Sequence, residues 1–182
     1  AGVKVIRTQR GRPAAARNSG IAAAAGAIIC FTDADCEPMA DWLVNITAPF
    51  DDARISATKG TYATRQRSLV ARFVQLEYED KYDHMAREER IDFIDTYSAA
   101  YRASALRGQG GFDPRFDYLE DQELSFRLAA SDHTMVFQPS AVVYHTHVES
   151  IWAYFRKKFT IGYWKPQVVR RFPDRAVRAS HT

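Results

Sequence analysis

The chain has 182 residues, of which 46% are hydrophobic and 26% charged, and a formal net charge of +3. This length and composition suit one globular domain with a sizeable core. No apolar run approaches the roughly 20 residues of a membrane span, and the N-terminus lacks the pattern of a signal peptide. Two cysteines, Cys30 and Cys36, are too few for a disulfide framework. We therefore expect a protein of the cytoplasm.

The first half of the chain alternates short apolar segments with helical patterns. The apolar run at 27–31 predicts a buried strand, and the alanine-rich stretch before it predicts a helix that ends at Gly26. Residues 9–13 predict a turn. We expect strands at 3–6, 27–31 and 59–64, and helices at 14–26, 41–46 and 66–90. This strand–helix rhythm with short links favours a parallel α/β layer.

The second half continues the alternation. The helix at 66–90 is expected to turn one apolar face toward the core, made of Leu69, Phe73, Leu76, Tyr82 and Met85. After it we expect a strand at 91–101, a glycine loop at 108–111, a helix at 120–130, and closing strands at 136–137 and 142–144.

Residues 151–182 differ from the preceding 1–150 in charge. They carry eight Lys and Arg against one Asp, a net charge of +7, which leaves −4 for the rest of the chain. We expect a basic, aromatic helical segment interrupted by Pro166 and Pro173. These basic residues form either a solvated helix face or a binding surface for anions, which would be phosphates or an anionic membrane leaflet. Nucleic acid is not expected, because no base-reading motif accompanies the charge. The candidate interfacial anchors are Trp152, Tyr154, Tyr163 and Trp164.

A pair of carboxylates follows the apolar run, in Thr32-Asp33-Ala34-Asp35-Cys36. Two carboxylates one residue apart offer the hard oxygen ligands that Mg²⁺ and Mn²⁺ prefer, and a diphosphate can complete the coordination. Alone, such a pair is equally typical of a loop or helix cap. Cys36 is expected to pack rather than to bind, because thiolate is too soft for these metals. The alternative is a zinc site of Cys36 with His145 and His147.

Four motifs then follow one another in a specific order. They are Gly11-x5-Arg17-Asn18-Ser19-Gly20, Asp33-Ala34-Asp35, Gly110-Gly111-Phe112-Asp113 with Glu120-Asp121 after it, and Pro139-Ser140-x4-His145 with His147 two residues later. Together they resemble the family 2 glycosyltransferases of the GT-A fold, over about residues 3–164. The resemblance implies an α/β fold with a Rossmann-type mixed sheet flanked by helices.

The family usually begins with a strand–helix–strand segment that holds an acidic nucleotide-binding loop, and this sequence shows no equivalent. The resemblance therefore implies an N-terminally truncated domain at 1–150, which by itself is expected to bind nucleotide weakly and to be inactive. Many relatives continue into membrane helices after a basic segment, so we expect 151–182 to be membrane-proximal.

On the donor side, the resemblance implies a nucleotide-sugar, which we expect to be a UDP-sugar, with Mn²⁺ or Mg²⁺ on its diphosphate. Asp35 is expected to bind the metal directly, and Asp33 to bind the ribose or the metal and its waters. The family's downstream histidine corresponds to His145. His147 is its competitor, because strand alternation would place both on one face. Arg17 is expected to contact the diphosphate, although an Arg on a helix is otherwise a solvated side chain.

On the acceptor side, the resemblance makes Asp121 the general base, with Glu120 beside it for acceptor binding or pKa tuning. The helix N-terminus is expected to keep Asp121 ionised at neutral pH; alternatively, both acids only complement the helix dipole. An Asp at this position implies inversion at the anomeric carbon. Asn18 is expected to order the loop, and Gly110 and Gly111 to let the backbone approach the sugar.

We therefore predict an inverting, metal-dependent, hexosyltransferase-like enzyme (EC 2.4) with a DXD motif, placed in the cytoplasm or at the inner face of the cell membrane. Its acceptor is expected to be a glycan or a lipid-linked molecule, and exposed strand edges are expected to favour a homo-oligomer. One alternative is a non-catalytic fragment that acts as a binding or assembly module. Another is a metal-dependent nucleotidyltransferase or phosphohydrolase, against which the order of the motifs argues.

Overall fold

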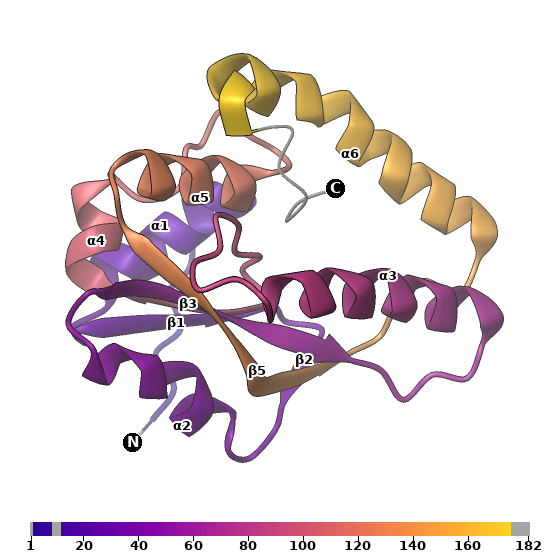
Figure 1. Cartoon of the computed structure of the whole chain (residues 1–182), viewed down its shortest axis with the longest axis horizontal. Helices are drawn as coiled ribbons and strands as arrows, with labels where there is room; N and C mark the ends of the chain where they lie inside the picture. Colours follow the sequence, from indigo (N-terminus) through magenta and orange to yellow (C-terminus); the bar gives the residue numbers. More distant parts are fainter. Residues whose placement is uncertain (1, 9–11, 176–182) are drawn as a thin grey trace.

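A single mixed sheet forms the centre of the computed structural model, which describes residues 2–8 and 12–175 (Figure 1). Its five strands have the order β1-β4-β3-β5-β2. β3 and β5 pair in parallel, and the other three pairs are antiparallel. The expected mixed α/β sheet is thus confirmed, whereas a purely parallel layer is wrong. The strands are β1 (Ile28–Thr32), β2 (Cys36–Pro38), β3 (Ile55–Ala63), β4 (Ser98–Arg102) and β5 (Thr134–His145).

Helices flank the sheet on both faces (Figure 1). α1 (Pro13–Ala23), α4 (Ala103–Gly108) and α5 (Glu120–Ala130) pack on one face, and α2 (Trp42–Thr47) packs on the other. α6 extends above α3 and α5 in this view. The remaining elements are α3 (Leu69–Met85), α6 (Ile151–Arg171) and the short 3₁₀ turns η1 (Ala48–Asp51) and η2 (Pro173–Arg175).

Two apolar cores lie on opposite faces of the sheet. Successive residues of a strand point to opposite faces, and in β4 the side chains of Ala99 and Tyr101 enter one core while Ala100 enters the other. The first core is closed by α1, α4 and α5, and includes the fully buried Leu106 and Leu124. The second is closed mainly by α2. The helices that carry Arg17 and Asp121 therefore pack on the same face.

The helices that carry the predicted site begin for identifiable reasons. Pro13 opens α1, where its fixed φ suits the first turn and its missing N–H costs no hydrogen bond. The helix ends at Ala23, so the expected cap at Gly26 is wrong. α5 covers the predicted 120–130 and follows Leu119, which has a left-handed φ of 64°. That sharp reversal directs Glu120 and Asp121 into the first turn of α5.

Residues 3–6 do not form the expected strand. Val3 and Val5 are 93% and 76% exposed, and the segment pairs with no strand among the described residues. A strand gains its backbone hydrogen bonds only from a neighbour, so apolar composition alone does not create one. The predicted turn at 9–13 falls largely outside the described residues, because 9–11 are not among them.

The expected buried face of α3 is also partly wrong. Tyr82 and Met85 are buried, but Leu69, Phe73 and Leu76 are 87%, 51% and 56% exposed. The helix instead buries a neighbouring row, which consists of Ala71, Val74 and Gln75 in addition to Tyr82 and Met85.

Other boundaries differ in ways that the sheet explains. The strand expected at 91–101 is confined to β4, and the two closing strands are one long strand, β5. β5 pairs with β3 in parallel on both sides of a register shift between Lys59 and Thr61. Pro166 lies inside α6 and does not interrupt it. None of the described helices is both long and apolar enough to cross a membrane.

Candidate active site

Arg17 joins two of the predicted acidic motifs. Its guanidinium forms an ion pair with Glu120 and lies 3.3 Å from Oδ1 of Asp33. Phe112 packs beneath it, with the guanidinium carbon 5.5 Å from the ring centroid. Arg17 is about one-fifth exposed and Glu120 is nearly buried. α1 therefore brings the end of β1 and the start of α5 together through one partly buried cation.

The second aspartate of the pair faces the predicted histidine. Oδ2 of Asp35 lies 3.3 Å from Nε2 of His145, because β2 pairs with β5 in a register that places Cys36 opposite His145. Asp35 is 65% exposed in its side chain, whereas His145 is only 10% exposed. Behind His145, the buried His147 ring lies with its Nδ1 3.0 Å from Nδ1 of His145. His145, and not His147, is thus the histidine that faces Asp35.

The glycine loop after α4 is held in place by two side chains. Asn18 donates to the carbonyl of Phe112 at 2.7 Å and accepts from its N–H at 2.9 Å. Arg127 donates to the carbonyl of Gly111 at 2.7 Å. Gly110 and Gly111 have φ values of 74° and 72°, a left-handed conformation that favours glycine. Asn18 therefore orders this loop, as expected.

Asp121 lies in an acidic setting that the sequence did not indicate. Burial, together with the carboxylates of Glu120 and Asp95, raises the pKa of Asp121 to about 8. The N–H of Gln122 donates to its Oδ1 at 2.8 Å. The expectation that the helix N-terminus alone keeps this carboxylate ionised is wrong, because burial and like charge outweigh the helix dipole.

Asp95 is in turn anchored by a buried lysine. Lys59, in the middle of β3 and only 1% exposed, forms an ion pair with Asp95 and donates to the hydroxyl of Tyr97 at 2.9 Å. Burial lowers the pKa of Lys59. Neither residue belongs to a recognisable motif. The one available signal was a charged residue in a strand that is otherwise uncharged, at Lys59.

The donor set at Asp35 and His145 fits a small divalent ion. Two donors that bind one such ion at about 2.1 Å lie about 3 Å apart, close to the observed 3.3 Å. Among the described residues, no three His, Cys, Asp or Glu side chains converge as a complete ligand set. Asp33 is paired with Arg17. Burial raises the pKa of the Cys36 thiol to about 11, which disfavours the thiolate that would bind a metal. A protein-only zinc site with Cys36 therefore has no support here, and other ligands would have to come from substrate and water.

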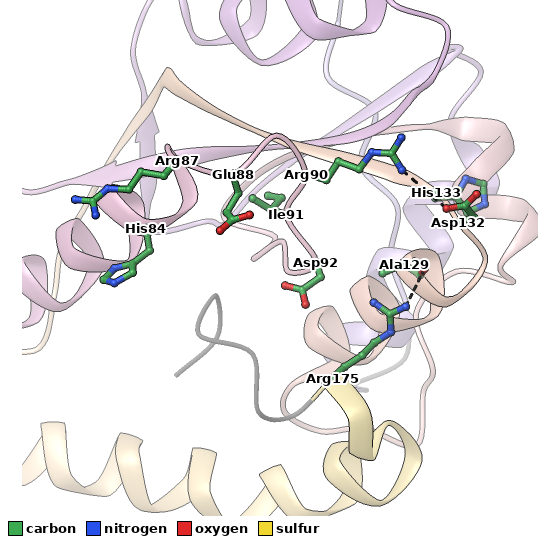
Figure 2. Close-up of a pocket in the computed structure, with 10 residues that line it drawn as sticks. All are labelled: His84, Arg87, Glu88, Arg90, Ile91, Asp92, Ala129, Asp132, His133 and Arg175. Atoms are coloured by element: carbon green, nitrogen blue, oxygen red, sulfur yellow. Dashed lines mark hydrogen bonds and ion pairs between the residues drawn. The ribbon is translucent and has the colours of Figure 1, made fainter.

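A cavity of about 480 Å³ lies apart from these residues (Figure 2). It is bordered by the end of α3 at His84, the following turn at Arg90, and the turn after α5 at Asp132. Arg90 and Asp132 approach to 3.9 Å, and Arg175 donates to the carbonyl of Ala129. None of the predicted catalytic or metal-binding residues lines this cavity, and Asp35 and His145 instead line a separate hollow.

The mixed sheet flanked by helices has the fold of the GT-A glycosyltransferases. The chain belongs to the glycosyltransferase-like family 2, whose profile matches residues 1–163. A curated relative, the pre-mycofactocin glycosyltransferase of Mycobacterium tuberculosis, is 28% identical over 171 residues, which cover 90% of this chain. The match spans 36% of that relative, so this chain corresponds to about a third of its length.

Solved structures share the fold at low sequence identity. The mannosyltransferase PcManGT of Pyrobaculum calidifontis, in complex with GDP-Man and Mn²⁺, matches with a TM-score of 0.60 and 20% identity, over 81% of this chain and 40% of that one. GalNAc-T7 with UDP, GalNAc and Mn²⁺ matches with a TM-score of 0.59 and 17% identity, over 79% of this chain and 32% of that one. S. aureus TarS 1-349 in complex with UDP-GlcNAc matches with a TM-score of 0.56 and 16% identity, over 80% of this chain and 42% of that one.

Proposed function

We propose that this chain carries the catalytic residues of an inverting, metal-dependent glycosyltransferase. The observation that carries the proposal is the position of Arg17, which contacts both Asp33 and Glu120. A donor-side carboxylate and an acceptor-side carboxylate from distant parts of the chain thereby lie at one site. Transfer of a sugar needs such an arrangement, because the leaving group and the nucleophile act on the same carbon.

On the donor side, Asp35 and His145 would hold Mn²⁺ or Mg²⁺ together with the diphosphate of the nucleotide-sugar. When bound, the divalent ion neutralises the negative charge of the leaving diphosphate. Asp33 is positioned by Arg17 beside this pair, where it would contact the ribose or water on the ion. Arg17 itself would exchange part of its contact with Asp33 for a phosphate oxygen.

On the acceptor side, Asp121 would remove the proton from the attacking hydroxyl. General bases work best when their pKa lies near the operating pH, and the raised pKa of Asp121 meets that condition. Glu120 is neutralised by Arg17 and would orient the acceptor. Gly110, where a Cβ would meet nothing within 4 Å, would let the loop that Asn18 fixes approach the sugar, and Gly111 would continue that loop.

The donor is proposed to be a UDP-hexose, and the acceptor a glycan or a lipid-linked hydroxyl. Two of the three structural neighbours are described with uridine nucleotides and one with GDP-Man, which supports a nucleotide-sugar donor and leaves UDP as our specific proposal. A nucleotidyltransferase is the second candidate, and it is distinguished by the product: transfer of the nucleotide would release a sugar 1-phosphate instead of a nucleoside diphosphate.

We further propose that α6 rests on the anionic inner face of the cell membrane, as a segment distinct from the catalytic domain at 1–150. A row of aromatic side chains is exposed along it, with Trp152 at 79%, Phe159 at 77% and Tyr163 at 68%, and basic residues flank the row. Such a helix suits the lipid–water interface. We expect the full-length protein to co-sediment with phosphatidylserine vesicles at low salt. No co-sedimentation at low salt would contradict this proposal.

The test uses the full-length protein with Mn²⁺ and a panel of UDP- and GDP-sugars. We expect release of a nucleoside diphosphate that EDTA abolishes and that Asp35→Ala reduces by at least about 100-fold. Asp83, which is exposed on α3, provides the matched control, and Asp83→Ala should leave the rate unchanged. Equal loss in both variants, or release of a sugar 1-phosphate in place of the nucleoside diphosphate, would contradict the proposed function.

A further inference from the structure

Gln75 of α3 has only one possible orientation of its side-chain amide. Its Nε2 donates to the carbonyl of Tyr62 at 3.1 Å and to Oε1 of Glu79 at 3.0 Å. Both partners are acceptors, so the amide nitrogen must point toward them. The amide oxygen Oε1 therefore points the other way, where it lies 2.9 Å from Nε2 of His147.

This orientation determines where the proton of His147 lies. An amide oxygen can only accept, so Nε2 of His147 must carry the hydrogen that it donates to Gln75. In the neutral ring, Nδ1 of His147 is then an acceptor. It lies 3.0 Å from Nδ1 of His145, so Nδ1 of His145 must in turn be the donor.

The ring atom of His145 that faces the candidate metal site is thereby left without a hydrogen. With the proton on Nδ1, the lone pair of Nε2 points toward Oδ2 of Asp35 at 3.3 Å. Two electron-rich atoms repel each other at this distance, and a cation between them removes the repulsion. We propose that Gln75 and His147 form a hydrogen-bond relay that holds His145 as its Nδ1–H tautomer, so that Nε2 is a ready ligand for a divalent cation. This proposal rests on the proposed function for the identity of the site.

Packing keeps the rings from turning out of this relay. Tyr62 stacks on His145, with centroids 4.5 Å apart at 26°. Tyr78 stacks on His147, with centroids 5.7 Å apart at 11°. His147 is 3% exposed, and its backbone N–H donates to the side chain of Gln66. Metal-binding histidines commonly donate their second N–H to a carboxylate, carbonyl or water; here a second imidazole, oriented by an amide, takes that place.

Gln75 and His147 are positioning residues, because they act through His145. Their effect is measurable without any transferase activity, by ¹⁵N NMR of the histidine rings of the full chain at pH 8 without metal. We expect Nδ1 of His145 to give the shift of a protonated nitrogen and Nε2 that of an unprotonated one. The reverse assignment in the wild-type chain would overturn the proposal.

His147→Phe removes the acceptor while keeping a ring against Tyr78. We expect His145 to revert toward the Nε2–H form, and the affinity for Mn²⁺ alone, measured by electron paramagnetic resonance titration, to fall about 10–100-fold. His147→Asn keeps an acceptor oxygen near the position of Nδ1 and should restore most of both signals. His133, whose Nδ1 lies 2.9 Å from the hydroxyl of Ser56, is the control, and His133→Phe should change neither.

An unchanged tautomer and unchanged Mn²⁺ affinity in His147→Phe would overturn the relay. If His147→Phe does not fold, His147→Asn decides: loss of the Nδ1–H form despite the restored acceptor contradicts the proposal, and its retention supports it. The outcome is separable from the proposed function. If His145 has its proton on Nδ1 but the protein transfers no sugar, the glycosyltransferase proposal is refuted and the relay is supported. If the protein transfers sugar but His145 has its proton on Nε2, the relay is refuted and the glycosyltransferase proposal is supported.

Discussion

Asp121, which we propose as the general base, is buried at the expense of stability above neutral pH. Its carboxyl is buried beside Glu120 and Asp95, and these neighbours raise its pKa. The folded state therefore binds a proton more tightly than the unfolded state does. By linkage, this contribution to stability is largest at low pH and is lost as the pH rises from about 4, the ordinary value for Asp, toward about 8.

Asp121→Asn should accordingly stabilise the protein above neutral pH. Asn cannot ionise, so the free energy of unfolding should rise by on the order of 1–2 kcal/mol at pH 8 and much less at pH 5. Urea denaturation at both pH values measures the difference. Asp83→Asn, at an exposed carboxylate of α3, serves as control. A gain of equal size at both pH values would show that the effect is not due to ionisation of Asp121.

At the scale of elements, the contact between α1 and the glycine loop makes a specific demand on Gly111. A Cβ built there would lie 2.5 Å from Oδ1 of Asn18, whereas a Cβ at Gly110 would meet nothing within 4 Å. Both glycines have positive φ. The two positions therefore share the same backbone strain and differ only in the steric contact.

Gly111→Ala should consequently destabilise the chain more than Gly110→Ala. Each should lose about 1 kcal/mol from the positive φ, and Gly111→Ala should lose roughly 1–3 kcal/mol more because the bonds between Asn18 and Phe112 are displaced. Chemical denaturation of the two variants gives the comparison. Equal destabilisation would mean that Asn18 does not constrain this loop.

The sequence predicted most elements and failed where tertiary contacts decide. α5 was predicted with its observed bounds, because a change to helical periodicity follows a clear loop. α3 has apolar residues on two faces, so periodicity could not show that Ala71 and Val74 would be buried in place of Leu69 and Phe73. Register shifts of β5 against β3 likewise depend on the partner strand.

Pro166 illustrates a related limit of local reasoning. Proline removes one hydrogen bond of a helix and crowds the carbonyl four residues earlier. In α6 that residue is Gly162, which has no side chain, and both positions are exposed, so water can satisfy the carbonyl. Pro166, a local signal for a helix end, is therefore accommodated inside α6 because Gly162 is small and both positions are exposed to water.

The candidate site divides in the same way between sequence and structure. Motif order pointed to Asp33, Asp35, Glu120 and Asp121, and the structure brings two of them, Asp33 and Glu120, together through Arg17. The polar residues that support them have no motif, because a buried hydrogen-bond network is defined by three-dimensional contacts. Those that sequence reasoning missed are Lys59, Gln75, Asp95 and Arg127.

At the scale of the whole molecule, part of the basic charge of α6 is used to hold that helix against the domain. Lys158 lies 2.8 Å from Glu77 of α3, and Arg171 lies 2.9 Å from Asp113 and 3.0 Å from Glu123. The guanidinium groups of Arg115 and Arg171 lower the pKa of Asp113. The helix thus spans from α3 to the loop before α5 (Figure 1).

The central claim is that this molecule transfers a sugar with Asp121 as the base. The most direct measurement is the steady-state rate of nucleoside diphosphate release by full-length Asp121→Asn, with donor affinity measured in parallel by calorimetry. We predict that kcat falls by about 10²–10⁴-fold, the usual contribution of a general base, while donor affinity stays within about threefold because Asp121 lies on the acceptor side. Unchanged turnover in Asp121→Asn would contradict the account.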